Sequence, residues 1–248
     1  MTPRTYLAAT ARILAQLRAD RRTVALIVAV PSVLLTLLYF VYSDLPGADP
    51  LFDRIAVSMM AILPMTTLFL VTSVAMLRER VSGTLERLWT TPTHRADVLF
   101  GYATAFVCTA LVQSLVLCAV AVWGLEVTVT AGWGWVLLLA LVTGFVGVCL
   151  GLLVSAFARS EFQAVQFMPV VIAPQLFLCG LLVPRESMPR PLELIGDVLP
   201  MSWAVDAVTQ VATETDVSAG FVHRVGFLLA FGLVALTVAA LTVPRRTR

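Results

Sequence analysis

The sequence contains no lysine, and all seventeen of its basic residues are arginines. A P-loop ATPase needs a lysine on the nucleotide phosphates, and a Schiff-base enzyme needs one as its nucleophile. These 248 residues therefore exclude both activities. Charge is scarce as well, because 13% of the residues are charged whereas 59% are hydrophobic. Soluble domains carry about a quarter charged residues, so the composition predicts an integral membrane protein.

Metal ligands and catalytic groups are also sparse. The only two histidines are His94 and His223, and the four cysteines form no CxxC pair. All four lie inside apolar runs, so we interpret them as small core residues and expect neither a disulfide framework nor a metal site. A membrane enzyme would need acids or histidines clustered at one site, and only scattered acids are found. We therefore predict no catalytic residue.

Six stretches are long and apolar enough to cross a membrane, since a spanning helix needs about twenty mostly apolar residues. They cover residues 23–42, 55–77, 98–122, 133–158, 162–183 and 221–243. None carries a charge in its central part, where an arginine would cost about 3 kcal/mol or more. The predicted fold is an all-α polytopic membrane protein, with an amino-terminal segment at 1–22 and a six-span domain at 23–248.

The arginines predict the orientation, because short cytoplasmic loops collect positive charge. With both termini in the cytoplasm, the inner side holds thirteen arginines and five acids, and the outer side holds four arginines and ten acids. The sequence therefore predicts cytoplasmic termini. The first apolar run is expected to stay as an anchor, because no convincing cleavage site follows it.

Residues 1–22 are predicted to form a basic amphipathic helix along the membrane surface. Thr2 can cap this helix, with Pro3 at its first position. A solvated leader with some helicity is the alternative. The apolar stripe consists of Leu7, Ala11, Ile13, Leu14 and Leu17, and the polar positions are Arg4, Arg12, Gln16 and Arg18.

The predicted external loop from Pro184 to Gly220 is long and far from fully polar. Its part "LELIGDVLPMSWAVDAV" can be interpreted as short helices that are broken at Pro200 and dip into the outer leaflet. Irregular backbone at that depth must be shielded by protein. We therefore expect a partly re-entrant loop that caps the bundle before the last span.

The stretch "RERVSGTLERLWTTPTHRAD", residues 78–97, is the largest predicted cytoplasmic loop. Residues 82–84 break the helix that leaves the second span, and "TLERLW" then makes about one and a half helical turns. A capped helix restarts after Pro92 and runs into the third span. A short, rigid amphipathic helix of this kind is suited to a groove on a soluble partner. A loop that merely collects positive charge is the alternative, but it does not explain the Gly-Thr-x-Glu spacing.

This loop resembles the conserved cytoplasmic loop of the type-2 family of ATP-binding-cassette permeases, especially the daunorubicin-resistance-like exporters. The likeness extends to the amino-terminal elbow helix, the six spans and the hydrophobic segment "GLLVPRESMPRPLELIGDVLPMSWAVDAV". The family pattern of Glu, Gly-Thr-x-Glu-x-Leu, Pro and a later Gly falls on Glu79, Gly83, Thr84, Glu86, Leu88, Pro92 and Gly101.

The resemblance implies a permease subunit of an exporter for an amphipathic drug, antibiotic or lipid-like molecule in a bacterial plasma membrane. A second permease, identical or related, and two copies of a P-loop ATPase would complete the complex. ATP and Mg would be bound by the ATPase, so this chain would hold no cofactor, and no nucleic acid is implied. The elbow and the charged loop would contact the ATPase. The coupling residues implied are Glu79, Gly83, Thr84, Leu85, Glu86, Arg87, Leu88, Pro92 and Arg12.

The resemblance also places the transport path between two permeases, along the first, second and fifth spans. Met and Phe can repack around varied amphiphiles, and buried amides cost free energy unless they are used. Ordinary helix packing is the alternative for each of them. The candidates are Met65, Thr66, Thr67 and Phe69 on the second span and Gln166, Phe167, Met168, Gln175 and Phe177 on the fifth.

Two further patterns concern helix shape and packing. Prolines 64, 169 and 174 are predicted to kink the second and fifth spans. The Gly147-x-x-x-Gly151 motif predicts close helix packing inside the protomer. An ion-coupled transporter without an ATPase is the alternative function, but it would need an ionisable residue within a span, and none is found at mid-depth.

Overall fold

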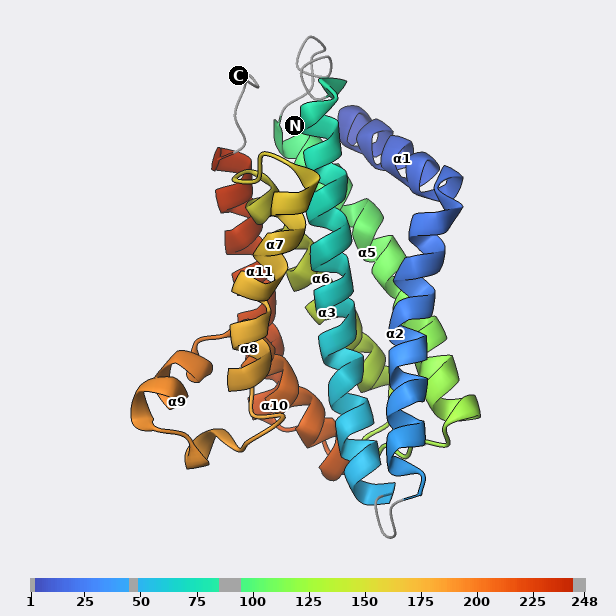
Figure 1. The fold of residues 1–248 in the computed structure, drawn as a ribbon, viewed down its shortest axis with the longest axis vertical. Coiled ribbons are helices and arrows are strands. Elements are labelled where there is room, and N and C mark those ends of the chain that lie inside the picture. The colour runs from blue at the N-terminus through green and yellow to red at the C-terminus, as the bar shows by residue number, and fades with distance from the viewer. Residues whose placement is uncertain (1–2, 45–48, 85–94, 243–248) are drawn as a thin grey trace.

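The computed structural model describes residues 3–44, 49–84 and 95–242, and every regular element within these ranges is helical, as predicted. Most helices run along the long axis, and α1 slants across one end (Figure 1). The elements are α1 (Pro3–Ala19), α2 (Arg21–Tyr42), α3 (Asp49–Val81), α5 (Arg95–Ala119), the π-helix η1 (Val120–Gly124), α6 (Trp133–Ser155), α7 (Glu161–Val171), α8 (Ala173–Leu178), the 3₁₀ helix η2 (Arg185–Ser187), α9 (Arg190–Asp197), α10 (Pro200–Thr213) and α11 (Ala219–Thr242).

Five helical segments within the described ranges are long and apolar enough to cross a membrane. They correspond to five of the six predicted spans. The predicted span 162–183 is instead divided into α7 and α8, which have 11 and 6 residues. Pro174 stands in the first turn of α8, where a proline without an N–H can begin a helix but cannot continue the preceding one. By contrast, α3 runs through Pro64 as one helix.

The core lies where α3 and α6 pack against each other, and α6 is the most buried of the five segments. Gly147 and Gly151 allow this approach because their missing side chains face the α3 backbone. A Cβ on Gly147 would overlap the Met65 carbonyl oxygen, and one on Gly151 would lie 2.6 Å from the Phe69 carbonyl oxygen. The close packing predicted from the glycine spacing is therefore confirmed.

The predicted external loop contains two helices that meet at Pro200. α9 ends at Asp197, and α10 begins at Pro200 and buries Met201, Ala204 and Val208. α9 projects sideways from the bundle, at the end opposite α1 (Figure 1). The predicted break at Pro200 is confirmed.

Candidate functional site

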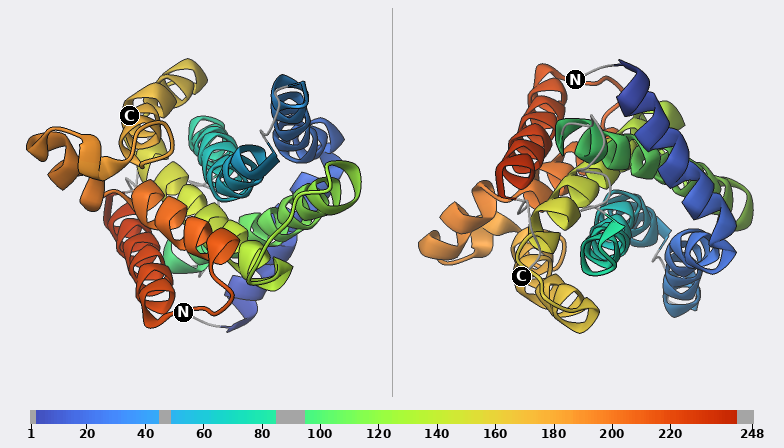
Figure 2. Two further views of the ribbon diagram at one scale, coloured as in Figure 1. Left: turned by 90° about the horizontal axis from the view of Figure 1, so that it is seen from below. Right: turned by 90° about the horizontal axis from the view of Figure 1, so that it is seen from above.

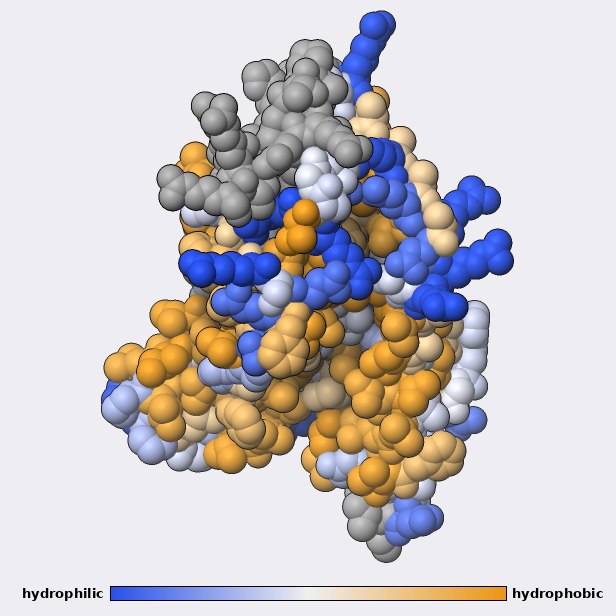
Figure 3. All heavy atoms as spheres, turned by 45° about the horizontal axis from the view of Figure 1, so that its top comes forward, coloured by the Kyte–Doolittle hydropathy of each residue, from blue (hydrophilic) through white to orange (hydrophobic). Residues whose placement is uncertain are grey.

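Polar side chains gather at the end of the bundle that carries α1, which we call the α1 end. It comprises α1, the last turn of α3, the first turns of α5 and the turn between α6 and α7. A band of hydrophilic side chains crosses this end, and the surface beyond it is mainly hydrophobic (Figure 3). Such a band is typical of the place where a membrane protein meets water.

The last turn of α3 carries three consecutive charges, Arg78, Glu79 and Arg80. Successive side chains of an α-helix point about 100° apart, so the three charges face different neighbours. Each of them bonds to a different element. We call these three residues and their partners the α3 junction.

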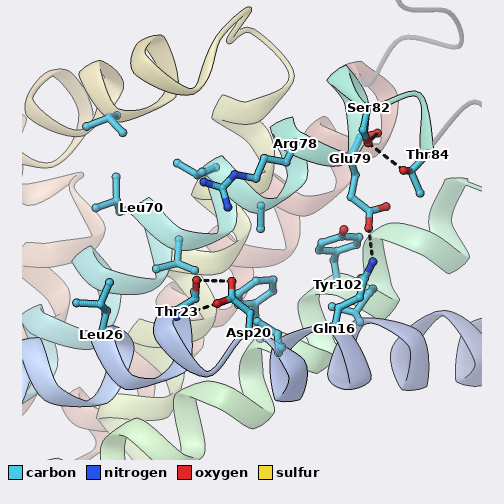
Figure 4. A pocket seen from close by; sticks show the side chains of 17 residues that line it. Gln16, Asp20, Thr23, Leu26, Leu70, Arg78, Glu79, Ser82, Thr84 and Tyr102 are labelled. Atoms are coloured by element: carbon cyan, nitrogen blue, oxygen red, sulfur yellow. Dashed lines mark hydrogen bonds between the residues drawn. The ribbon is translucent and has the colours of Figure 1, made fainter.

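Glu79 joins α3 to α1. Its carboxylate accepts hydrogen bonds from Arg12 Nη2 at 2.9 Å and from Gln16 Nε2 at 3.1 Å. Glu79 is buried, with 8% exposed, and the buried ring of Tyr102 from α5 lies beside it (Figure 4). A buried carboxylate is stable only when it is paired, so this contact holds α1 against the end of α3. Two predicted coupling residues, 67 positions apart, are thus brought together.

Arg80 joins α3 to the carboxyl end of α6. Its guanidinium donates to the carbonyl oxygens of Ser155 and Ala158. The last carbonyls of a helix lack intrahelical hydrogen-bond partners and carry partial negative charge. An arginine there supplies both the missing hydrogen-bond donors and a positive charge. The α6–α7 turn is therefore held against α3.

Arg78 joins α3 to the first residue of α7. Its Nε and Nη2 donate to the two oxygens of Glu161 at 2.8 and 2.9 Å. This two-pronged bond holds the pKa of Glu161 below its ordinary value of 4.5, because a bonded cation favours the ionised carboxylate. Ser160 caps α7 by accepting from the Gln163 N–H, which fixes the start of the helix.

We expect Glu161→Gln to lower the stability of the chain at neutral pH by less than about 1 kcal/mol, because the pair is solvent-exposed. A lowered carboxyl pKa stabilises the fold above the unfolded-state value, and this contribution is lost as the pH falls through the folded value. The difference in melting temperature from the natural chain should therefore be present at pH 7 and shrink as the pH falls below the ordinary pKa of the carboxyl group. Glu186→Gln, at an exposed acid of η2, is the control. A pH-independent difference for Glu161→Gln would contradict the ion-pair interpretation.

α1 also packs directly on α5, which it crosses when the molecule is seen from the α1 end (Figure 2). Thr5 Oγ1 donates to Asp97 Oδ2 at 2.9 Å. Gly101 allows close contact, because a Cβ there would lie 3.0 Å from Ala9 Cβ and 3.2 Å from the Thr10 nitrogen. The glycine of the family-like pattern thus has a packing role beneath α1.

Residues 3–19 of the predicted amphipathic segment form the helix α1, but its faces do not divide simply into membrane and water. Ile13 from the predicted stripe is buried, whereas Leu7 is 61% exposed. From the predicted polar positions, Arg12 and Gln16 face Glu79 of α3. Some of the polar residues that the sequence periodicity places on the water-facing side of the helix therefore form bonds to another helix instead.

The helix break at residues 82–84 is confirmed. α3 ends at Val81, and Gly83 has φ +72°, a conformation that favours glycine. Ser82 and Thr84 share a hydrogen bond of 2.9 Å between their hydroxyls. The predicted "TLERLW" helix and its restart lie outside the described residues, as do the coupling candidates Leu85, Glu86, Arg87, Leu88 and Pro92.

The candidate path residues of α3 fall into two groups. Met65 and Phe69 are fully buried against the glycines of α6. Thr66 and Thr67 are partly exposed, and the Thr66 hydroxyl donates to the Leu63 carbonyl at 3.0 Å. The structure therefore brings the first two into the protomer core and leaves the threonines at its edge.

The candidate path residues of the fifth predicted span are also spread over different surroundings. Gln175 is buried, donates to the Val171 carbonyl at 2.8 Å and accepts from the Met201 N–H at 3.4 Å. Gln166 and Phe177 are exposed, whereas Phe167 and Met168 are half-buried. Gln175 thus links α8 to α10, and the exposed members lie on the outer surface of the described chain.

Sequence reasoning missed several residues of the α3 junction, namely Gln16, Arg78, Arg80, Tyr102 and Glu161. The Arg-Glu-Arg run at the end of an apolar helix was the available signal for two of them. Within residues 3–44, 49–84 and 95–242, no group of three or more His, Cys, Asp or Glu side chains could hold a metal ion. The junction offers ion pairs and hydrogen bonds that connect α3 to α1, α6 and α7.

Comparison with known proteins agrees with this picture. A family model described as ABC-2 type transporter matches residues 4–212. The probable multidrug ABC transporter permease YbhR of Escherichia coli is 25% identical over 154 residues, which cover 62% of this chain and 42% of YbhR. The linearmycin resistance permease protein LnrN of Bacillus subtilis is 26% identical over 66% of this chain and 42% of LnrN. ABC transporter G family member 20 of Dictyostelium discoideum is 30% identical over 64% of this chain and 22% of its own length. The chain therefore matches less than half the length of each of these relatives.

Proposed function

The chain belongs to the ABC-2 type transporter family, and from this we propose that it is the membrane permease subunit of an ATP-driven exporter. The observation that carries the proposal is the α3 junction. A charged helix end that leads into the 85–94 segment is bonded to α1, α6 and α7 at once. This arrangement is suited to receive a displacement from outside and to distribute it among the helices.

In the proposed mechanism, a separate P-loop ATPase binds at the α1 end and acts on α1 and residues 85–94. The ATPase supplies ATP binding with Mg and hydrolysis. This chain contributes the receiving surface, with Glu79, Gly83, Thr84, Leu85, Glu86, Arg87, Leu88, Pro92 and Arg12 as coupling residues. Packed helices rearrange between discrete states rather than deforming continuously, so movement of the α3 end would shift α7 and α1 together. Arg78 and Glu161 provide the bond toward α7.

The proposed topology has six crossings, with both termini and the α1 end in the cytoplasm of a bacterium. α7 and α8 together form the remaining, broken crossing, and α9 and α10 form the partly re-entrant external segment. The arginine asymmetry of the loops supports this orientation. Broken helices at membrane depth are tolerated where protein shields the freed backbone groups, and the buried Gln175 of α8 supports such shielding.

The proposed complex contains a second permease, identical or related, and two ATPase subunits. The substrate would be an amphipathic drug, antibiotic or lipid-like molecule, and the names of the multidrug permease YbhR and the linearmycin resistance permease LnrN support this class. The path between the permeases would draw on Thr66 and Thr67 and on the outer residues of α7 and α8. The buried candidates Met65, Phe69 and Gln175 would support the helices that line this path.

Purification of the tagged chain from native membranes in mild detergent tests the proposal. We expect a stoichiometric soluble subunit with a P-loop, identified by mass spectrometry, and ATP hydrolysis that rises with added amphiphile in the reconstituted complex. A second permease band would distinguish a heterodimer from a homodimer. A chain that emerges alone and moves solute along an ion gradient without ATP would overturn the proposal in favour of an ion-coupled transporter.

A further inference from the structure

A cavity of about 580 Å³ opens between the α1–α2 corner and the last three turns of α3. Tyr102 and Phe106 of α5 and Val165 of α7 complete its wall. Its volume is within the range of small-molecule sites. Its walls include the first, second and fifth predicted spans, but none of the individual candidate path residues lines it.

The lining changes from polar to apolar along the cavity. Ser82 and Thr84 lie at one end, and Leu26 and Leu70 lie at the other (Figure 4). Arg78 and Leu70 are eight residues apart on α3, which corresponds to about 12 Å of helix. An occupant that matches this gradient has a polar head and an alkyl chain.

The apolar end of the cavity reaches the outer surface of α2. Leu26 lines the cavity and is 60% exposed, and Val30 and Leu34 continue the same exposed apolar surface along α2. In the proposed topology this surface faces the acyl chains of the cytoplasmic leaflet. An amphiphile could therefore enter from the bilayer without losing the apolar surroundings of its chain.

The charges at the polar end favour a cationic head. Arg78 is engaged by Glu161, and both oxygens of Glu79 are engaged by Arg12 and Gln16. Asp20 is different, because its carboxylate is exposed and its side-chain hydrogen bonds go to the neighbouring Thr23. The charge of Arg78 and the Arg22 backbone N–H also act on this carboxylate, but no salt bridge engages it among the described residues.

Asp20 is therefore the charge available to an occupant. A carboxylate has about four lone-pair sites, so Asp20 can accept a further bond. The Thr23 bonds also lower the pKa of Asp20, so it is ionised at neutral pH. The adjacent Arg21 and Arg22 do not line the cavity.

We propose that this cavity binds a single-chain cationic amphiphile from the cytoplasmic leaflet, with its amine on Asp20 and its alkyl chain along Leu26 and Leu70. The inference rests on the proposed function for its orientation, and it deepens that function by naming a substrate class and an entry site. Arg78 and Glu79 line the same cavity and bond to α7 and α1. Occupancy would thus be sensed directly by the α3 junction.

The test uses the intact complex in phosphatidylcholine vesicles, labelled with a dodecylamine that carries a photoreactive diazirine on its chain. Asp20→Asn removes the charge but keeps a good helix cap for α2. Ala75→Leu narrows the cavity from α3. The matched controls are Asp216→Asn, an exposed acid in the loop before α11, and Ala230→Leu, an exposed position on α11.

We expect the label on peptides of α2 and α3, with competition by unlabelled dodecylamine and not by dodecanoate. Both cavity variants should lose labelling at least about fivefold, in line with the loss of one charge-assisted bond or of the space for the chain, and both controls should not. The proposal would be overturned if dodecanoate competed as well as dodecylamine, or if the extent of labelling were unchanged in both cavity variants. If labelling of the natural complex fell at least about fivefold on transfer from phosphatidylcholine to phosphatidylethanolamine vesicles, a membrane lipid would be the occupant. This result would also overturn the proposal.

Labelling does not depend on ATP, so its outcome is separate from that of the proposed function. Amphiphile-stimulated ATP hydrolysis without labelling of α2 and α3 would refute the cavity and leave the exporter standing. Specific labelling of a chain that binds no ATPase would support the cavity and refute the exporter.

Discussion

Glu79→Arg is expected to uncouple the complex, lowering amphiphile-stimulated ATP hydrolysis at least tenfold. The substitution places a second cation beside Arg12 at a site where only 10% of the Glu79 side chain is exposed. Breaking a fully buried pair in this way costs about 3–5 kcal/mol. The cost is smaller here, because Arg12 keeps 29% of its side chain exposed. It is nevertheless enough to separate α1 from the end of α3, and the measurement is ATP hydrolysis with and without amphiphile in reconstituted vesicles.

The exchange of both charges supplies the control for this prediction. Arg12→Glu combined with Glu79→Arg restores an ion pair between α1 and α3, so we expect it to recover most of the stimulated hydrolysis. Arg12→Glu alone should fail as Glu79→Arg does, because two carboxylates then face each other. Membrane insertion and basal hydrolysis are measured in parallel, since a misfolded chain would lose both. A double variant no better than either single one would show that the pair does not transmit the signal.

The sequence alone could predict the helical class, the helix break and the glycine contact, because each depends on local chemistry. Apolar length defines a crossing helix, and only glycine readily adopts the φ of Gly83. The close packing at Gly147 follows from small residues at helical spacing. Each of these signals is formed by residues that lie close together in the sequence.

The rest depends on tertiary contacts that local patterns do not contain. Arg12 is indistinguishable from a solvated arginine until Glu79, 67 residues away, is placed beside it. The division of the fifth predicted span could not be predicted from local sequence either, because prolines occur both inside the unbroken α3 and next to the break after α7. Whether a helix continues past a proline depends on which neighbours bond the freed backbone groups. The sequence indicated a charged end, and the structure shows how its charges are distributed among three helices.

This distribution requires a rigid support, because a displaced helix end moves its neighbours only if the helix itself is held. α3 is held along its middle by α6, where the glycines let the two backbones meet. The junction and the glycine contact therefore form one mechanical unit. Removing the contact should have a larger effect on the chain than any substitution at its polar surface.

Gly147→Ala is accordingly expected to be the most destabilising single methyl addition in α6. The new Cβ would overlap the Met65 carbonyl oxygen and lie 2.9 Å from its carbonyl carbon, and backbone atoms cannot move aside as a side chain tip can. Overpacking usually costs about 1–3 kcal/mol, and a backbone clash belongs at or above the upper end of that range. The yield of monodisperse protein in mild detergent and its melting temperature measure the effect.

Gly226→Ala is the matched control, because it adds the same methyl group to the helix α11 where nothing lies within 4 Å. It should leave the melting temperature unchanged or raise it slightly, since alanine favours helix more than glycine does. Equal melting of the Gly147→Ala and natural chains would mean that α3 and α6 do not meet at this glycine. The route from the α3 junction to the core would then have to pass through α1 and α5 instead.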